Sequence, residues 1–242
     1  EVSDLMGTEY NSYWGYQNGK KRNSRDKDTE EPILILSHYW KINDNTKINS
    51  NVSYQFGSIA NSRFDFNNAN NPDPVYYRNL PSYKMFSFLD NGGTFETEQD
   101  RNNFISESNA WFRNNSQIDW DNIYESNKNS GISQIVLYED RTDDKLFSAN
   151  SYLMSQLSNN IILNAGVTYR KLKSNNYQRL TDLLGGTSFR DYDRFLTGDG
   201  QQTDLNNPNR YVVEGDKYGY NYNLLADVVD AFTQFKFSYD KV

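Results

Sequence analysis

The side chains of this sequence that could do chemistry are mainly carboxylates. Clustered carboxylates can bind Ca²⁺, and two groups are candidates, namely Asp140, Asp143 and Asp144, and Asp191, Asp193 and Asp199. The spacing of the first group does not match an EF-hand loop and lacks its glycine. We therefore interpret both groups as solvated loop acids and expect no metal site.

Other residues that often catalyse reactions occur singly or in common patterns. The only histidine, His38, shares one face of a predicted strand with Leu36 and Trp40, which favours a structural position over a catalytic base. Glycosidases use two carboxylates, and Glu30–Glu31 and Glu96/Glu98 are pairs of acids. Such pairs are common in loops, so they do not indicate a glycosidase. Gly185–Gly186 lacks the Lys and Ser/Thr of a phosphate-binding loop. We expect no catalytic residue, no enzyme activity and no cofactor.

The composition narrows the class of protein. The 242 residues contain no cysteine, which excludes disulfides and thiolate metal sites. The net charge of −7 argues against a nucleic-acid partner, because such binding depends on basic contacts to phosphate. Aromatic residues make up 15% of the chain, which suits strands and excludes disorder. Residues 1–7 carry no signal-peptide pattern, and we expect the chain to be an internal part of a longer protein.

The elements that must position these residues are long strands joined by very short turns. Hairpins are predicted at about 32–57, with a turn at 44–46, and at about 145–172, with a turn at 158–160. A last strand is predicted at about 231–239, and the strand from 47 could continue to Phe66 with a bulge at Gly57. Long polar loops are predicted at about 67–131 and 173–223, the first with a short helix at 98–112, while 1–31 is predicted to be mostly loop.

The two hairpins alternate apolar and polar residues in a way typical of outer-membrane β-barrels. The predicted fold is all-β, an antiparallel transmembrane β-barrel with long extracellular loops. The mean hydropathy of −0.90 is compatible with this fold, because a barrel places apolar residues only at alternate positions. We predict a lipid-facing wall made by Ile48, Val52, Tyr54, Phe56, Leu163, Val167 and Tyr169.

The predicted strand number leaves alternatives open. Five to seven strands are too few for a closed barrel, since known single-chain barrels begin at about 8. We therefore expect a partial wall of a larger barrel. One alternative is a soluble secreted β-sandwich that serves as a glycan-binding module, and a weaker one is a small complete barrel with unrecognised strands.

Aromatic residues in the predicted loops are candidates for ligand binding. Their rings could stack on a ligand or simply pack within the loops, and the sequence favours neither. The candidates are Tyr76, Tyr77, Trp111, Trp120 and Tyr192.

Several strings, taken together and in order, resemble the barrel of TonB-dependent receptors, in the subgroup with a carboxypeptidase-regulatory-like domain. They are YWGYQNGKKRNSR (13–25), NPDPVYYRNLPSY (71–83), VLYEDR (136–141), DLLGG (182–186), NPNR (207–210) and YNYN (220–223).

The resemblance implies a 22-stranded barrel in the outer membrane of a Gram-negative cell, a plug domain inside it, and TonB-powered uptake of a solute. The sequence shows no plug domain and no TonB box, so the expectation is that 1–242 forms the barrel portion only. The implied partners are TonB, reached through the plug, outer-membrane lipid, and surface-exposed lipoproteins or other outer-membrane proteins.

Overall fold

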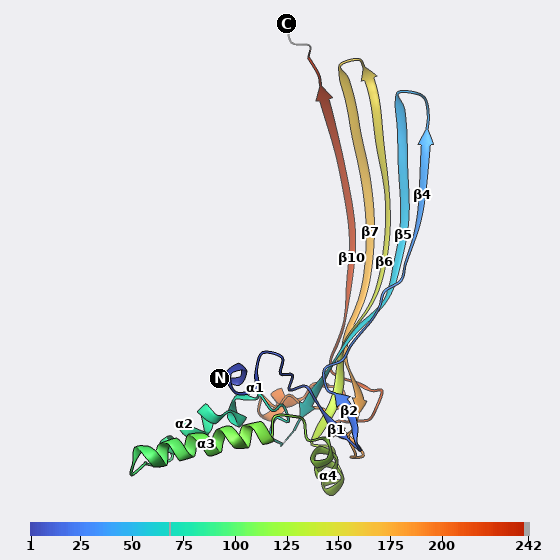
Figure 1. The fold of residues 1–242 in the computed structure, drawn as a ribbon. Helices are drawn as coiled ribbons and strands as arrows, with labels where there is room; N and C mark the ends of the chain where they lie inside the picture. The colour runs from blue at the N-terminus through green and yellow to red at the C-terminus, as the bar shows by residue number, and fades with distance from the viewer. Residues whose placement is uncertain (68, 240–242) are drawn as a thin grey trace. The chain divides into compact units, whose positions relative to one another are not determined.

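The computed structural model describes residues 1–67 and 69–239 (Figure 1). Strands in antiparallel sheets are the main secondary structure of the described chain, with helices in the connections. The chain divides into two compact units. The loop unit comprises 1–26, 61–139 and 179–219, and the sheet unit comprises 27–60, 140–178 and the chain from Tyr220 onward.

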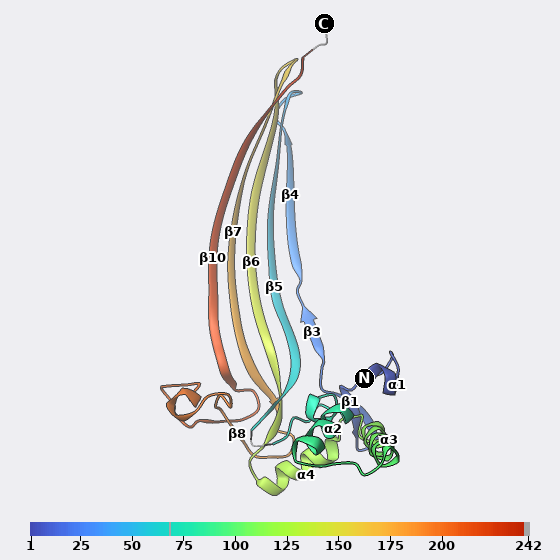
Figure 2. The same ribbon diagram turned by 90° about the vertical axis from the view of Figure 1, so that its left-hand side faces the viewer.

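A six-stranded sheet contains all of the long strands, which lie side by side in both ribbon views (Figures 1 and 2). Its order is β10-β7-β6-β5, and two short strands, β3 and β4, both pair with β5. The bounds are β3 Lys27–Glu30, β4 Ile33–Lys41, β5 Thr46–Phe66, β6 Ile135–Ser158, β7 Ile161–Asp182 and β10 Lys217–Phe237.

The break between β3 and β4 coincides with the predicted irregularity at Gly57. Gly57 has a φ of 146°, and a Cβ at this position would collide with the carbonyl oxygen of Glu30. Only glycine allows this close approach of the two backbones. Pairing resumes where the Phe56 amide donates to the Pro32 carbonyl at 3.2 Å. The expected extension of the strand from residue 47 to Phe66 is confirmed.

The predicted strands are correct in place but too short. β6 begins at Ile135 rather than near 145, β7 ends at Asp182 rather than near 172, and β10 begins at Lys217 rather than near 231. The added part of β10 contains apolar residues at 224–225 and 228–229, which do not alternate with polar ones. The added segments 139–144 of β6 and 173–179 of β7 are mostly polar on both faces, so they show no apolar alternation. Their strands are joined instead by polar side chains, such as Thr142 Oγ1 to Asn176 Oδ1 at 2.9 Å and Tyr177 Oη to Asp143 Oδ2 at 2.8 Å.

The first long connection, between β5 and β6, is more helical than predicted. It contains η1 Tyr77–Asn79, α2 Pro81–Asp90, α3 Glu98–Asn114 and α4 Trp120–Ser130. The helix predicted at 98–112 is confirmed, and its start carries a capping box between Thr97 and Asp100. The helix α4 was missed because its apolar residues are few, although the Asp119 cap and Gly131, at φ 75°, mark its ends.

The first 31 residues are also more ordered than predicted. They contain α1 Val2–Met6 and a hairpin of β1 Trp14–Gln17 with β2 Lys20–Asn23. Asn18 and Gly19 connect the hairpin with φ values of 50° and 76°, the conformation that Asn-Gly favours in two-residue hairpin turns. The second long connection contains β8 Phe189–Arg190 paired with β9 Tyr211–Val212, and η2 Gly198–Gln201.

Most of the buried hydrophobic residues lie in the loop unit, on both sides of the start of β6. Ile135 and Leu137 pack with residues of the α4 region, and Val136 points the other way. One cluster is Ile118, Trp120, Ile123, Ile135, Leu137 and Leu184, and the other is Val136, Leu180, Leu183, Phe189, Val212 and Tyr218. Among the described helices, none combines the length and the apolar character needed to cross a membrane.

Candidate functional site

The candidate site is the six-stranded sheet, whose two faces differ in chemistry. Residues directly opposite each other on paired strands share a face. In the β4–β5 pair, Leu34 is opposite Tyr54, Leu36 is opposite Val52, and Trp40 is opposite Ile48. These residues define what we call the apolar face. His38 lies on the same face, opposite Ser50, in line with the structural position expected for it.

Side-chain contacts extend the apolar face across the sheet. From β5 to β6, Ser50 Oγ lies 2.9 Å from Ser151 Oγ. From β6 to β7, the rings of Phe147 and Tyr169 have centroids 6.3 Å apart. From β7 to β10, Tyr169 Oη donates to Asp227 Oδ1 at 2.7 Å. The face that carries the apolar residues of β4 and β5 therefore continues to β10, and it includes polar side chains such as Ser50 and Asp227.

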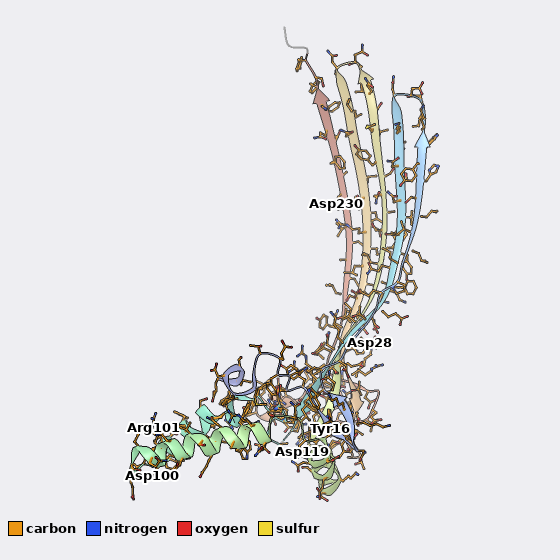
Figure 3. All side chains as sticks on the ribbon, viewed as in Figure 1. Tyr16, Asp28, Asp100, Arg101, Asp119 and Asp230 are labelled. Atoms are coloured by element: carbon orange, nitrogen blue, oxygen red, sulfur yellow. The ribbon has the colours of Figure 1, made fainter. Side chains whose placement is uncertain are left out.

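The opposite surface of the sheet, which we call the polar face, has its own series of side-chain contacts between neighbouring strands. Asn51 Nδ2 donates to Asn150 Oδ1 at 3.0 Å between β5 and β6, and Tyr152 Oη donates to Asn164 Oδ1 at 2.8 Å between β6 and β7. Between β7 and β10, Arg170 Nη2 pairs with Asp230 Oδ2 at 2.8 Å. Figure 3 labels Asp230 on β10. Carboxamides, hydroxyls and an ion pair thus line much of this face, together with apolar side chains such as Ile35, which is opposite Ser53.

The seven residues predicted to form the wall all lie on the apolar face. Ile48, Val52, Tyr54 and Phe56 come from β5. Leu163, Val167 and Tyr169 come from β7, where they share a face because they are separated by even numbers of residues, and Tyr169 contacts Phe147 of β6. Val52 is 42% exposed and Val167 is 49% exposed, so no second layer covers them in the described part of the chain. The structure therefore brings together residues that are more than 100 positions apart in the sequence.

The candidate aromatic residues of the connections do not form one site. Tyr76 and Tyr77 touch each other, with ring centroids 4.7 Å apart, and Tyr77 continues to Tyr83 at 5.2 Å. Trp111 lies on α3 and is 42% exposed. Tyr192 belongs to the second connection, where the guanidinium of Arg190 lies 5.0 Å from its ring centroid.

Trp120 was expected among the ligand-binding aromatics, and this expectation is wrong. Its side chain is fully buried, with the guanidinium of Arg22 4.4 Å from its ring centroid. The indole Nε1 donates to the Arg22 carbonyl at 3.2 Å, and Arg22 itself pairs with Asp182 at 2.5 Å. The polar sequence around Trp120 suggested an exposed loop, whereas the ring closes the core between α4 and the β1–β2 hairpin.

The interpretation of Asp191 as a solvated loop acid is also wrong. Asp191 is 3% exposed, pairs with Arg210 at 2.5 Å and accepts a hydrogen bond from the Gly219 amide at 3.1 Å. Asp140 and Asp143 lie in β6 rather than in a loop, and accept hydrogen bonds from Tyr220 and Tyr177. In the described residues, no three His, Asp or Glu side chains gather closely enough to hold a metal ion.

Asp65 near the end of β5 is a buried acid that the sequence gave no reason to select. Arg194 Nη1 donates to it at 3.0 Å and Tyr218 Oη at 3.1 Å. Burial raises the pKa of Asp65, and the charge of Arg194 opposes this shift. Burial beside Asp65 also raises the pKa of Tyr218. The group fastens the second long connection to the end of the sheet and offers no open position for a substrate.

Comparison with known proteins finds no match to this chain, whether among family models, curated proteins or solved structures.

Proposed function

We propose that this chain is part of the wall of an outer-membrane transporter of the TonB-dependent receptor type, in a Gram-negative cell. Such a wall takes part in energy-coupled uptake of a solute and catalyses no reaction. The observation that carries the proposal is the two-faced sheet, with an apolar face that has no covering layer in the described residues.

The length of the apolar stretch supports a membrane environment. On β7 the alternating apolar residues run from Ile161 to Tyr169, after which Lys171 follows on the same face. A tilted strand crosses the hydrocarbon layer with about 9–11 residues. Soluble monomers rarely leave contiguous apolar patches of more than a few hundred Å² exposed. Hydrocarbon is therefore the covering that suits this face.

The two edges of the sheet support a wall larger than this sheet. β4 and β10 each have a partner on one side only within the described residues. An unpaired strand edge in lipid leaves backbone groups without hydrogen bonds, so transmembrane sheets close on themselves. Further strands must complete the barrel on both sides of the six strands described here.

The cellular setting follows from the family resemblance. It includes outer-membrane lipid around the apolar face, a plug within the barrel, TonB acting through that plug, and surface lipoproteins or other outer-membrane proteins as possible complex partners. The long connections would capture the solute.

The soluble β-sandwich remains the competing proposal and has less support. A sandwich covers the apolar face of one sheet with a second sheet about 10 Å away. Besides the six-stranded sheet, the described residues form only the two-stranded sheets β1-β2 and β8-β9, and both belong to the loop unit.

A spin-label scan along β7 tests the proposal. The chain has no cysteine, so single cysteines at 161–170 can each carry a nitroxide without a background signal. With the chain refolded in lipid vesicles, labels at Leu163 and Val167 should be accessible to oxygen, which dissolves in lipid. Labels at Asn164 and Thr168 should be accessible to a water-soluble nickel chelate.

The matched control is the same scan at positions 173, 175, 176 and 178 of β7, which are not buried and where both faces should favour the nickel chelate. Equal nickel accessibility at Val167 and Thr168 in vesicles would overturn the membrane proposal.

A further inference from the structure

The loop unit contains a cleft that the wall proposal does not use. Its volume is about 700 Å³, and it lies between residues 69–79, the end of α3, and α4. This volume is in the range of ligand-binding pockets. All of its lining residues are in the described part of the chain and in one unit.

The lining of the cleft is unusual in being dominated by carboxamides. Seven of its fifteen lining residues are Asn or Gln, and only one, Asp119, carries a charge. Figure 3 labels Asp119, just before α4. Asp119 Oδ1 accepts from the Asn122 amide at 3.0 Å, and no other residue of the described chain donates a hydrogen bond to Asp119 Oδ2. The cleft contains one large aromatic residue, Trp111.

Several of these carboxamide groups keep free hydrogen-bonding capacity. The side-chain oxygen of Asn71 accepts from the Asp73 amide, which leaves the side-chain nitrogen of Asn71 as a donor. The side-chain nitrogen of Asn79 donates to the Asp73 carbonyl, which leaves the side-chain oxygen of Asn79 as an acceptor. The side chain of Asn122 has no protein partner among the described residues. Gln117 Oε1 is buried without a partner. The cleft thus presents both donors and acceptors.

The chemistry of the lining selects a class of ligand. An anion would meet no Lys, Arg or His and would be repelled by Asp119, and a metal cation would find one carboxylate where it needs several. A hydroxyl both donates and accepts, as a carboxamide does, so a ligand with many hydroxyls matches this surface. Trp111 adds a flat apolar surface for the carbon-bound hydrogens of a ring.

We propose that this cleft binds a neutral, polyhydroxylated ligand of the oligosaccharide class. The site goes beyond the wall function, because binding is measurable whether or not the sheet spans a membrane. The further step, that the cleft first holds the cargo during uptake, rests on the proposed function.

Two neighbouring residues contact Trp111, the aromatic residue of the cleft. Lys84 Nζ lies 2.9 Å from the centroid of the Trp111 ring and so covers one of its faces. The Asn115 side chain donates to the Trp111 carbonyl at 2.8 Å, which fixes the backbone there. One face of the Trp111 ring is therefore covered by Lys84, its backbone is fixed by Asn115, and the residue lines the cleft.

Isothermal titration of the full chain in detergent tests the proposal. The probes are maltohexaose, cellohexaose, xylohexaose and laminarihexaose, with an oligogalacturonate and a neutral Gly/Ser peptide as competitors of other classes. At least one neutral oligosaccharide should bind. Asn122→Ala and Trp111→Phe should each weaken that binding by about tenfold or less, as expected for one hydrogen bond or one stacking surface.

The control is Phe86→Ala, which removes an aromatic residue that is 59% exposed and lies outside the cleft lining. It should leave the affinity unchanged, and circular dichroism should show all variants folded. The proposal is overturned if no neutral oligosaccharide binds at millimolar concentration. It is also overturned if only the acidic oligosaccharide or the peptide binds, or if Asn122→Ala and Trp111→Phe bind like the unmodified chain.

Discussion

At the scale of single residues, the buried side chain of Asn127 joins several segments of the loop unit by hydrogen bonds. Its side-chain nitrogen donates to the carbonyls of Ile135, Leu183 and Leu184 at 2.7, 3.1 and 3.0 Å. Its side-chain oxygen accepts from the amides of Gln134 and Ile135 at 2.8 and 3.2 Å. One fully buried side chain therefore joins α4, the start of β6 and the chain after β7.

Replacing Asn127 should destabilise the loop unit strongly. Asn127→Leu leaves buried backbone groups without partners, and each such group costs about 1–3 kcal/mol. We expect the free energy of unfolding to fall by about 3 kcal/mol or more. Urea unfolding of the chain in detergent, followed by tryptophan fluorescence, measures this. Asn129→Leu on the exposed side of α4 is the matched control, and equal losses in both variants would contradict the role of Asn127.

Asp65 should make the stability of the loop unit depend on pH. Its raised pKa means that the folded chain holds the proton more tightly than the unfolded chain. Its contribution to the free energy of unfolding therefore falls as the pH rises from the ordinary carboxyl value, about 3.9, through the raised one. Asp65→Asn should remove this slope in urea unfolding between about pH 4 and pH 7.

Asp204 supplies a control of opposite sign for this titration. The Asn207 side chain, which donates to Asp204, lowers the pKa of that carboxyl. Its contribution to stability is therefore lost as the pH falls. Asp204→Asn should remove a slope below about pH 4, where stability rises with pH, whereas Asp65→Asn should remove one above about pH 4, where stability falls with pH. Slopes of the same sign in both variants would refute this account.

At the scale of elements, the strands show how a glycine is used within a sheet. A Cβ on Gly166 would collide with the ring of Phe232, which lies across it on the polar face. Phe232 belongs to β10, and its ring centroid lies 6.2 Å from that of Tyr152 on β6, the strand beyond β7. Phe232 therefore lies over the glycine and bridges three strands, β6, β7 and β10.

Filling this space should impair the sheet. Gly166→Val forces Phe232 aside, and overpacking of this kind costs about 1–3 kcal/mol. Ala165→Val, one residue earlier on the apolar face, is the control and should be tolerated. The measurement is the fraction of chain that refolds in lipid vesicles into a protease-resistant form. A similar refolding yield for both variants would show that the Phe232 ring can move aside without a measurable loss of stability.

The two faces of the strands should respond differently to a charge. Val52→Asp and Val167→Asp place a carboxylate on the apolar face, whereas Asn49→Asp and Thr168→Asp place one on the polar face. Charged lipid-facing residues cost about 2–4 kcal/mol for Arg or Lys near the midplane and less for acids. The first pair should lower assembly into membranes and the second should have mild effects. Equal losses on both faces, measured by membrane fractionation, would count against the wall.

The sequence predicted elements well where one physical signal dominated. Ile48, Val52 and Val167 stand at every second position of strands with polar residues between them, so both hairpins and their faces could be predicted. The polar extension through Thr142 and Asn176 could not, because its strands are joined by hydrogen bonds that leave no pattern in hydropathy.

The candidate site was predictable only in part, for a related reason. The position of Trp120 in the core depends on Arg22, about 100 residues earlier, and no local pattern announces such a contact. The Asn18-Gly19 turn was recognisable by its residue types and was overlooked within a charged stretch. The carboxamide cleft joins residues from a loop and two helices, of which one helix was not predicted.

At the scale of the whole molecule, the described sheet has two open edges. β4 and β10 each pair on one side only, and both have exposed apolar residues, such as Leu36 and Val229. Natural proteins protect such edges by pairing or covering them. In the proposed barrel, the stability of this chain would therefore depend on the strands that pair with these two edges.

Hydrogen exchange in detergent should detect the open edges. Amides of β10 that point away from β7 should exchange faster than amides of the central strand β6, which has partners on both sides. The measurement is the exchange rate of each amide at a concentration where the chain is monomeric. Uniformly slow exchange along β10 would mean that its outer edge has a partner within this chain.

The unequal connections of the sheet have a practical consequence for anyone who alters the protein. At one end, β6 and β7 are joined by Asn159 and Asn160 alone, while at the other end the links span 67–134 and 183–216. A reporter epitope placed in a two-residue link would break the pairing of its hairpin, whereas the tip between α2 and α3 can accept one. Antibody staining of intact cells carrying a tag at that tip would then reveal which end of the sheet faces the outside.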